Sequence, residues 1–514
     1  MIIRPILAAI GALLHVVSVT GDYDAPFYTA AVVEYSALGN RSVNTPQDIL
    51  LLNANNYLHY IKQAASAKVD IIVFPECGLS TIYLPTNRSE IRPFLTSIPD
   101  PKKEDINPCV DSATDVSEVL KILSCAALNA SLYVVVNLPE IQECEGMGCP
   151  DDEAFFYNTD IAFDRKGKLI ARYRKYNLFG EPGFDITTKP EISTFQTDFG
   201  VRFGMSTCFD IFFHDPILQL VKELAITDIV FPVAWFSEMP FLTALQIQSS
   251  WSYATNINLL AAGYDDPGNY NGGSGIFAGK NGIMKAIMPL TLHSEYNDPA
   301  KNHSNRLLIS KVPKKTHTHE EVPELENTTL ITNPTNDSER IFYHDYLIPY
   351  TTKTINKTQT FTTVCDRELC CEFKIEIETI PSINSTQYRI AVFNGIRIFY
   401  GGKTSGIQVC AIIACDNSSL ASCGKKPRVT KETTVFKTIS IQGKFNNTKS
   451  LHMPSTLLKS YMPLNVDSYE MLSKSHAENL TQIYLHTTKE IKNLLTFGIY
   501  SREYGLDGLP FTEF

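Results

Sequence analysis

Short, nearly continuous apolar runs alternate with helix-like segments through the first 300 residues, and this alternation constrains the fold most strongly. The runs at 28–35, 69–75 and 131–137 are each long enough for one strand. The segments 45–67 and 117–129 have the apolar spacing of amphipathic helices. Strands without a polar face are buried on both sides, so we expect an α/β domain of layered sheets and helices.

The sequence changes character near residue 310. Residues 311–335 are rich in Lys, Thr, His, Glu and Pro, which is typical of a linker, and segments beyond it are rich in β-branched and aromatic residues. The chain of 514 residues also exceeds the roughly 250–300 residues at which a single core stops growing. We predict an α/β domain over 22–310, a linker over 311–335 and a smaller, mainly β domain over 336–514.

The N-terminal residues 1–20 have the pattern of a signal peptide. Arg4 precedes an apolar stretch from Ile6 to Val19, and small residues follow at its end. A membrane anchor is the alternative, but this stretch is short for a span and contains His15. We therefore expect a secreted, extracellular protein without a membrane span.

Glycosylation sequons of the form Asn-x-Ser/Thr are spread along the whole chain, which supports passage through the secretory pathway. They occur at Asn40, Asn87, Asn129, Asn302, Asn327, Asn336, Asn356, Asn384, Asn417, Asn446 and Asn479. The formal net charge of -10 argues against nucleic acid or an anionic membrane as a partner, because both bind concentrated Lys and Arg.

Three residues with complementary chemistry follow predicted strands. Glu76 ends one apolar run, Lys175 follows another strand, and Cys208 lies where a strand leads into the next segment. Alone, each has an ordinary explanation as a solvated cap, a hairpin edge or a structural thiol. Together they supply a base, a cation and a nucleophile for attack on an acyl carbon, with the Phe209 N–H available to an oxyanion.

The cysteines fit this assignment. A nucleophilic Cys208 has to stay unpaired, and we expect Cys77 to be the second free thiol because it follows a buried strand. The other ten predict two disulfides in the N-terminal domain and three in the C-terminal one, with the connectivity left open. The N-terminal four are Cys109, Cys125, Cys144 and Cys149, and the C-terminal six are Cys365, Cys370, Cys371, Cys410, Cys415 and Cys423.

Several motifs resemble the vanin and biotinidase family of the nitrilase superfamily, in both predicted domains. They are Lys175-Tyr-Asn-Leu-Phe179, Thr207-Cys-Phe-Asp-Ile211, Phe213-His-Asp-Pro216, Gly273-Ser-Gly-Ile276, Val364-Cys-Asp-Arg-Glu-Leu-Cys-Cys371, Val409-Cys410 and Cys423-Gly424. The resemblance implies an αββα sandwich that hydrolyses a vitamin-linked amide with no metal or organic cofactor. It also implies the roles of the site residues. Cys208 is the nucleophile, Glu76 the general base and acid, and Lys175 the cation at the oxyanion, while Glu181 supports the site and Trp235 lies near the substrate.

The resemblance leaves the substrate open. Our first hypothesis is hydrolysis of pantetheine to pantothenate and cysteamine, and the second is hydrolysis of biotinyl-lysine. A binding protein that kept the fold without turnover is the third, although Glu76, Lys175 and Cys208 are all present. Cys77 and the loop 263–270 differ from the pattern that we expect of the vertebrate members of the family. We expect a monomer or a loose dimer, because glycans cover flat surfaces.

Overall fold

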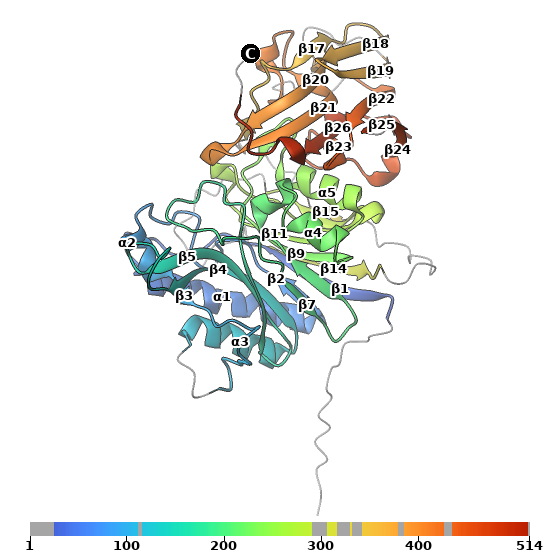
Figure 1. Ribbon diagram of the computed structural model, residues 1–514. Coiled ribbons are helices and arrows are strands. Elements are labelled where there is room, and N and C mark those ends of the chain that lie inside the picture. Colours follow the sequence, from blue (N-terminus) through green and yellow to red (C-terminus); the bar gives the residue numbers. More distant parts are fainter. Residues whose placement is uncertain are drawn as a thin grey trace, which may run out of the picture.

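The structure is a computed structural model (Figure 1). It describes residues 25–111, 116–289, 306–315, 329–331, 342–378, 385–425, 434–477 and 479–511. The predicted signal peptide and most of the predicted linker lie outside these residues. So do four of the sequons, at Asn302, Asn327, Asn336 and Asn384.

Two mixed seven-stranded sheets form the centre of the N-terminal domain (Figure 1). The first has the order β14-β1-β2-β4-β5-β6, with β3 paired to β4, and the second has the order β15-β13-β12-β11-β9-β8-β7. The strands of the first sheet are β1 (Phe27–Glu34), β2 (Ile71–Val73), β3 (Thr96–Ser97), β4 (Tyr133–Glu143), β5 (Ala154–Phe163), β6 (Leu169–Arg174) and β14 (Arg306–Pro313). Those of the second are β7 (Thr194–Gln196), β8 (Arg202–Met205), β9 (Asp228–Val233), β11 (Asn258–Gly263), β12 (Ser274–Ala278), β13 (Ile283–Ile287) and β15 (Thr329–Ile331).

Helices cover the outer face of each sheet, which gives four layers. They are α1 (Pro46–Ser66) and α3 (Glu118–Ala130) on the first sheet, and α4 (Ile217–Lys222) and α5 (Ala244–Thr255) on the second, with a short α2 (Arg88–Ile91) beside the first. Strand β1 has apolar residues on both faces because both are covered: Ala30 and Val32 face the other sheet, whereas Ala31 and Val33 pack against α1 and α3. The predicted αββα sandwich is confirmed.

The boundaries of α1 follow from local chemistry. The Thr45 side chain accepts a hydrogen bond from the Asp48 N–H, the Asp48 carboxylate accepts one from the Thr45 N–H, and Pro46 occupies the first turn. The helix therefore begins where the sequence predicted. It ends at Ala67, which leads the chain into β2 and toward Glu76.

The C-terminal domain is a sandwich of two five-stranded antiparallel sheets, which confirms the mainly β prediction. One sheet has the order β17-β20-β21-β26-β23 and the other has the order β18-β19-β22-β25-β24. The strands are β17 (Thr351–Thr354), β18 (Gln359–Asp366), β19 (Leu369–Ile377), β20 (Gln387–Ile398), β21 (Thr404–Cys415), β22 (Phe436–Asn446), β23 (Ser450–Leu458), β24 (Tyr469–Ala477), β25 (Leu480–Thr487) and β26 (Leu494–Glu503).

The two domains share one apolar core, because the sandwich packs directly on α5 (Figure 1). Residues 244–253 of this helix are all buried, although the helix lies on the outside of its own sheet. Gln246 Nε2 donates to Ser455 Oγ on β23 at 2.9 Å, and Trp251 is fully buried. The short strands β10 (Glu238–Met239) and β16 (Tyr343–His344) also pair across the junction.

Five disulfides form, as the cysteine pattern predicted, and Cys77 and Cys208 remain free. The pairs are Cys109–Cys125, Cys144–Cys149, Cys365–Cys370, Cys371–Cys410 and Cys415–Cys423. Each lies within one domain. Of the described sequons, Asn446 is half-buried and its side chain donates to Glu503, whereas the others are exposed.

The thiol content gives a direct test of this pairing. We expect two thiols to react with a chromogenic disulfide reagent when the protein is unfolded without reductant, and peptide mapping should assign them to Cys77 and Cys208. Reduction before labelling provides the control and should release all 12. Recovery of Cys208 in a disulfide would contradict the assignment.

The shared core predicts that both domains unfold in one transition. Opening either domain exposes the apolar surface of α5, so neither is stable without the other. Urea unfolding followed by tryptophan fluorescence, which includes Trp251 on α5, should coincide with unfolding followed by far-ultraviolet circular dichroism. Two separated transitions would show that the domains are independent.

Candidate active site

The structure brings Glu76, Lys175 and Cys208 together at one end of the facing sheets. Glu76 lies shortly after β2, Lys175 directly follows β6, and Cys208 lies shortly after β8. All three side chains are buried and line one cavity of about 650 Å³. Residues that are 132 positions apart in the sequence therefore share one site, because their strands end at the same edge of the sandwich.

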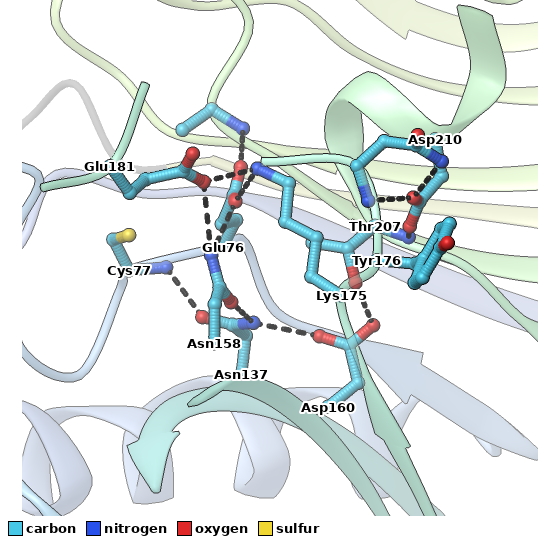
Figure 2. A network of polar contacts seen from close by, with 12 residues as sticks. Glu76, Cys77, Asn137, Asn158, Asp160, Lys175, Tyr176, Glu181, Thr207 and Asp210 are labelled. Atoms are coloured by element: carbon cyan, nitrogen blue, oxygen red, sulfur yellow. Dashed lines mark hydrogen bonds and ion pairs between the residues drawn. The ribbon is translucent and has the colours of Figure 1, made fainter. Parts of the chain in front are cut away.

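Three donors hold the Glu76 carboxylate (Figure 2). Its Oε1 accepts from Lys175 Nζ at 2.7 Å and from Asn158 Nδ2 at 2.8 Å, and its Oε2 accepts from the Ala234 N–H at 2.9 Å. These donors come from both sheets, so the position of the carboxylate depends on their packing. A carboxylate with this many fixed partners has a defined orientation toward the cavity.

Lys175 bridges two carboxylates. Its Nζ donates to Glu76 and, at 2.5 Å, to Glu181 Oε1. Burial alone lowers the pKa of Lys175, but the Glu181 and Glu76 carboxylates outweigh burial and raise that pKa well above its ordinary value. The ammonium therefore stays charged, and it can neutralise negative charge that develops beside it.

Cys208 begins a tight turn. It is the first residue of the 3-10 turn Cys208–Phe212 and has a left-handed backbone with φ of 45°. Burial raises the pKa of the thiol well above its ordinary value, as does the Glu76 carboxylate, whereas Lys175 and the Ala234 amide lower it. The resting thiol is consequently protonated and needs a base at the moment of attack.

A buried polar network fixes the turn (Figure 2). Thr207 Oγ1 donates to Asp160 at 2.6 Å, and the Thr207 N–H donates to Asp210 at 3.1 Å. Asn137 Nδ2 donates to Asp160 at 2.8 Å and to Asn158 Oδ1 at 2.6 Å. The chain of contacts links the residue before Cys208 to Asn158, which itself holds Glu76.

The supporting residues named from the sequence all line the cavity. Glu181 contacts Lys175, and Phe209 follows the thiol in the turn. Trp235 is held in place by a hydrogen bond that its Nε1 donates to the Leu242 carbonyl at 2.8 Å. Sequence reasoning missed Asn158 and the Ala234 amide. The polar Asn158 in the middle of the buried strand β5 was the available signal for that residue, whereas a backbone amide leaves no signal in the sequence.

The C-terminal domain also reaches the site. Arg397, Ile398, Phe399 and Tyr400 line the cavity, and the buried Arg502 donates from Nε to the Phe212 carbonyl at 2.8 Å. Phe212 ends the turn that Cys208 begins. The C-terminal domain thus contacts the turn that begins at Cys208 and also forms part of the cavity wall.

Among the described residues, no group of three or more His, Cys, Asp or Glu side chains has the arrangement of a metal site. The helices of the described ranges are also too short or too polar to cross a membrane.

Comparisons with known proteins match both domains. The carbon-nitrogen hydrolase family model matches residues 50–242, and the vanin C-terminal domain model matches residues 340–507. Vanin-like protein 2 of Drosophila melanogaster is 34% identical over 527 residues, covering 96% of this chain and 93% of that protein.

Two named enzymes are similar over most of their length. Human (Homo sapiens) biotinidase is 30% identical over 533 residues, covering 98% of this chain and 93% of that protein. Pantetheinase of Sus scrofa is 32% identical over 458 residues, covering 87% of this chain and 84% of that protein. These matches confirm the family that the sequence motifs indicated.

The raised pKa of Cys208 predicts that the folded protein holds no thiolate at this position at neutral pH. The thiolate should form only at alkaline pH, above the ordinary cysteine range of about 8.5. The difference in thiolate ultraviolet absorbance between the wild type and Cys208→Ala, followed against pH, measures this. A Cys208 thiolate already present at neutral pH would show that Lys175 outweighs burial and Glu76.

Proposed function

Because the chain belongs to the vanin and biotinidase family and is a carbon-nitrogen amide hydrolase, we propose that Cys208, Glu76 and Lys175 are its catalytic residues and pantetheine its substrate. The proposal depends above all on one observation. Glu76 is held by Lys175, Asn158 and the Ala234 amide, and it lines the same cavity as the buried Cys208 thiol. Nucleophile, base and cation therefore surround a single point in the cavity.

The first half of the reaction forms an acyl-enzyme. Glu76 accepts the thiol proton as Sγ of Cys208 attacks the amide carbon, and negative charge develops on the carbonyl oxygen. The Lys175 ammonium and the Phe209 N–H stabilise this oxyanion. Collapse then breaks the C–N bond, Glu76 returns its proton to the leaving amine, and the acyl group remains as a thioester.

The second half releases the acid. Glu76 accepts a proton from water, the resulting hydroxide adds to the thioester carbon, and the C–S bond breaks. The carboxylic acid leaves and Cys208 regains its proton. For pantetheine the amine is cysteamine and the acid is pantothenate. Every proton in this mechanism passes through Glu76.

The charges in the cavity support a neutral substrate. Lys175 contacts Glu76 and Glu181, and Arg397 forms ion pairs with Glu238 and, at 3.2 Å, with Asp345. Both cations of the cavity lining are therefore already matched by carboxylates. A small neutral amide such as pantetheine fits this balance and a cavity of about 650 Å³, within the usual range for ligand sites.

Hydrolysis of biotinyl-lysine is the second candidate, because the aromatic side chains in the cavity wall also suit a bicyclic acyl group. A secreted location belongs to the proposal as well. The five disulfides and the predicted signal peptide support an oxidising, extracellular environment.

Release of cysteamine from pantetheine, and of lysine from biotinyl-lysine, tests the proposal. We expect pantetheine turnover by the wild type and a loss of at least about a thousandfold in Cys208→Ala and Glu76→Gln, since each removes a group used in both half-reactions. Glu90→Gln, which changes an exposed carboxylate that is not part of the cavity lining, is the matched control and should keep full activity. Circular dichroism of each variant checks folding.

The remaining outcomes discriminate among the alternatives. Turnover of biotinyl-lysine alone would select the second candidate. Full activity in Cys208→Ala would exclude the proposed mechanism. Absence of turnover with both substrates would favour another amide or a binding protein of the same fold.

A further inference from the structure

A continuous row of aromatic rings borders the cavity and includes residues from both domains. We call it the aromatic rim and define it as Tyr400, Phe179, Phe236, Tyr343 and Tyr270. Neighbouring ring centroids in this order lie 5.6, 5.8, 6.2 and 3.9 Å apart. Four of the five rings line the cavity, and Tyr270 stacks on Tyr343 behind them.

Two rings of the rim are unusually exposed for their size. Tyr400 has 70% of its surface accessible and Tyr343 has 46%. Exposed aromatic side chains that gather beside a cavity are typical of binding surfaces, because their apolar faces are otherwise left in water. Single exposed aromatic residues scattered over the surface would not indicate a binding surface, but these rings form one row.

The position of Tyr400 is set by close packing between the two domains. It lies in the turn between β20 and β21, where its ring packs against Phe179. A Cβ added to Gly180 would lie only 2.7 Å from the Tyr400 ring, and Gly180 has φ of 69°. A Cβ on Gly401 would likewise lie 3.1 Å from Gly180 Cα, so the two backbones touch. The turn between β20 and β21 is therefore held in one position against the N-terminal domain.

Ion pairs hold the base of this turn. Arg397, near the end of β20, pairs with Glu238 of the N-terminal domain and with Asp345. On the other side of the turn, Lys403 Nζ donates to Asn177 Oδ1 at 3.3 Å. These contacts keep the Tyr400 end of the rim fixed relative to Lys175 and Cys208.

The other end of the rim involves the loop 263–270. Tyr270 ends the segment 263–270, and its stacking partner Tyr343 is on β16, which pairs with β10 beside the cavity. Asp266 of this loop accepts a hydrogen bond from Tyr83, and Asn269 donates to the same hydroxyl at 2.6 Å. The loop is thus anchored where it supports the rim.

We propose that the aromatic rim is the subsite that selects the acyl chain, binding the neutral portion of the substrate remote from the scissile amide. Tyr400 of the C-terminal domain and Tyr343 are its specificity-determining residues. The inference rests on the proposed amide hydrolysis at Cys208, and it assigns a function to the C-terminal domain, which completes the substrate site. Stacking and apolar contact favour acyl chains long enough to reach the rim.

Two matched substrate pairs test the subsite. Pantetheine is compared with N-acetylcysteamine, and biotinyl-lysine with Nε-acetyl-lysine, so that each pair keeps the same leaving group and differs only in the acyl chain. In Tyr400→Ala and Tyr343→Ala we expect kcat/KM for the long amide to fall about two- to tenfold while that for the short amide is unchanged. Tyr400→Phe keeps the ring and should restore the wild-type value.

Phe361→Ala is the matched control, because Phe361 is 82% exposed on β18 and lies outside the cavity lining. An equal loss for long and short amides in Tyr400→Ala would overturn the proposal and leave Tyr400 with only a structural role. Unchanged values for both amides would overturn it equally.

Binding without turnover separates this proposal from the catalytic one. Trp235 lines the cavity and is one of only two tryptophans, so its fluorescence reports ligand binding to Cys208→Ala. If the wild type hydrolyses neither long amide, the proposed function fails. The same fluorescence titration still compares the binding of the long amides to Tyr400→Ala and to Phe361→Ala. Weaker binding of the long amides only in Tyr400→Ala supports the rim. Equal binding, or none to any variant, overturns it.

Discussion

The ion pair between Lys175 and Glu76 is the interaction on which the site depends. Both charged groups are buried, and removing them from water costs free energy. Their mutual attraction offsets this cost only when their remaining donors and acceptors also have partners. Asn158, the Ala234 amide and Glu181 supply those partners, and they come from β5, from the segment after β9 and from the loop after Lys175. The pair therefore requires both sheets to be packed before it forms.

The burial of this pair also explains the charge states of Cys208 and Lys175. A buried thiol beside a carboxylate stays neutral, and a buried lysine between two carboxylates stays charged. The resting site thus holds a charged ammonium and a neutral thiol, which are the states that the proposed mechanism starts from. The same arrangement protects Cys208 from oxidation, because the thiolate is the form that oxidants attack.

The layered fold and the location of the site were largely predictable from the sequence. Apolar strands such as 69–75 require cover on both faces, and Glu76, Lys175 and Cys208 each follow a strand, so their meeting at one edge was a reasonable inference. The Ala234 amide was not predictable, because its role depends on a strand of the second sheet that lies 158 residues after Glu76 in the chain. That Tyr400 and Arg397 line the cavity was not predictable either, since it depends on how the β sandwich packs against α5.

The left-handed backbone at Cys208 has a consequence for stability. A residue with a side chain pays about 1–3 kcal/mol to hold such a conformation, whereas glycine adopts it freely. The strained backbone thus lies at the proposed nucleophile, which is also buried. Selection for a more stable chain and selection for a reactive one would pull this position in opposite directions, and the trade-off between them is concentrated in a single turn.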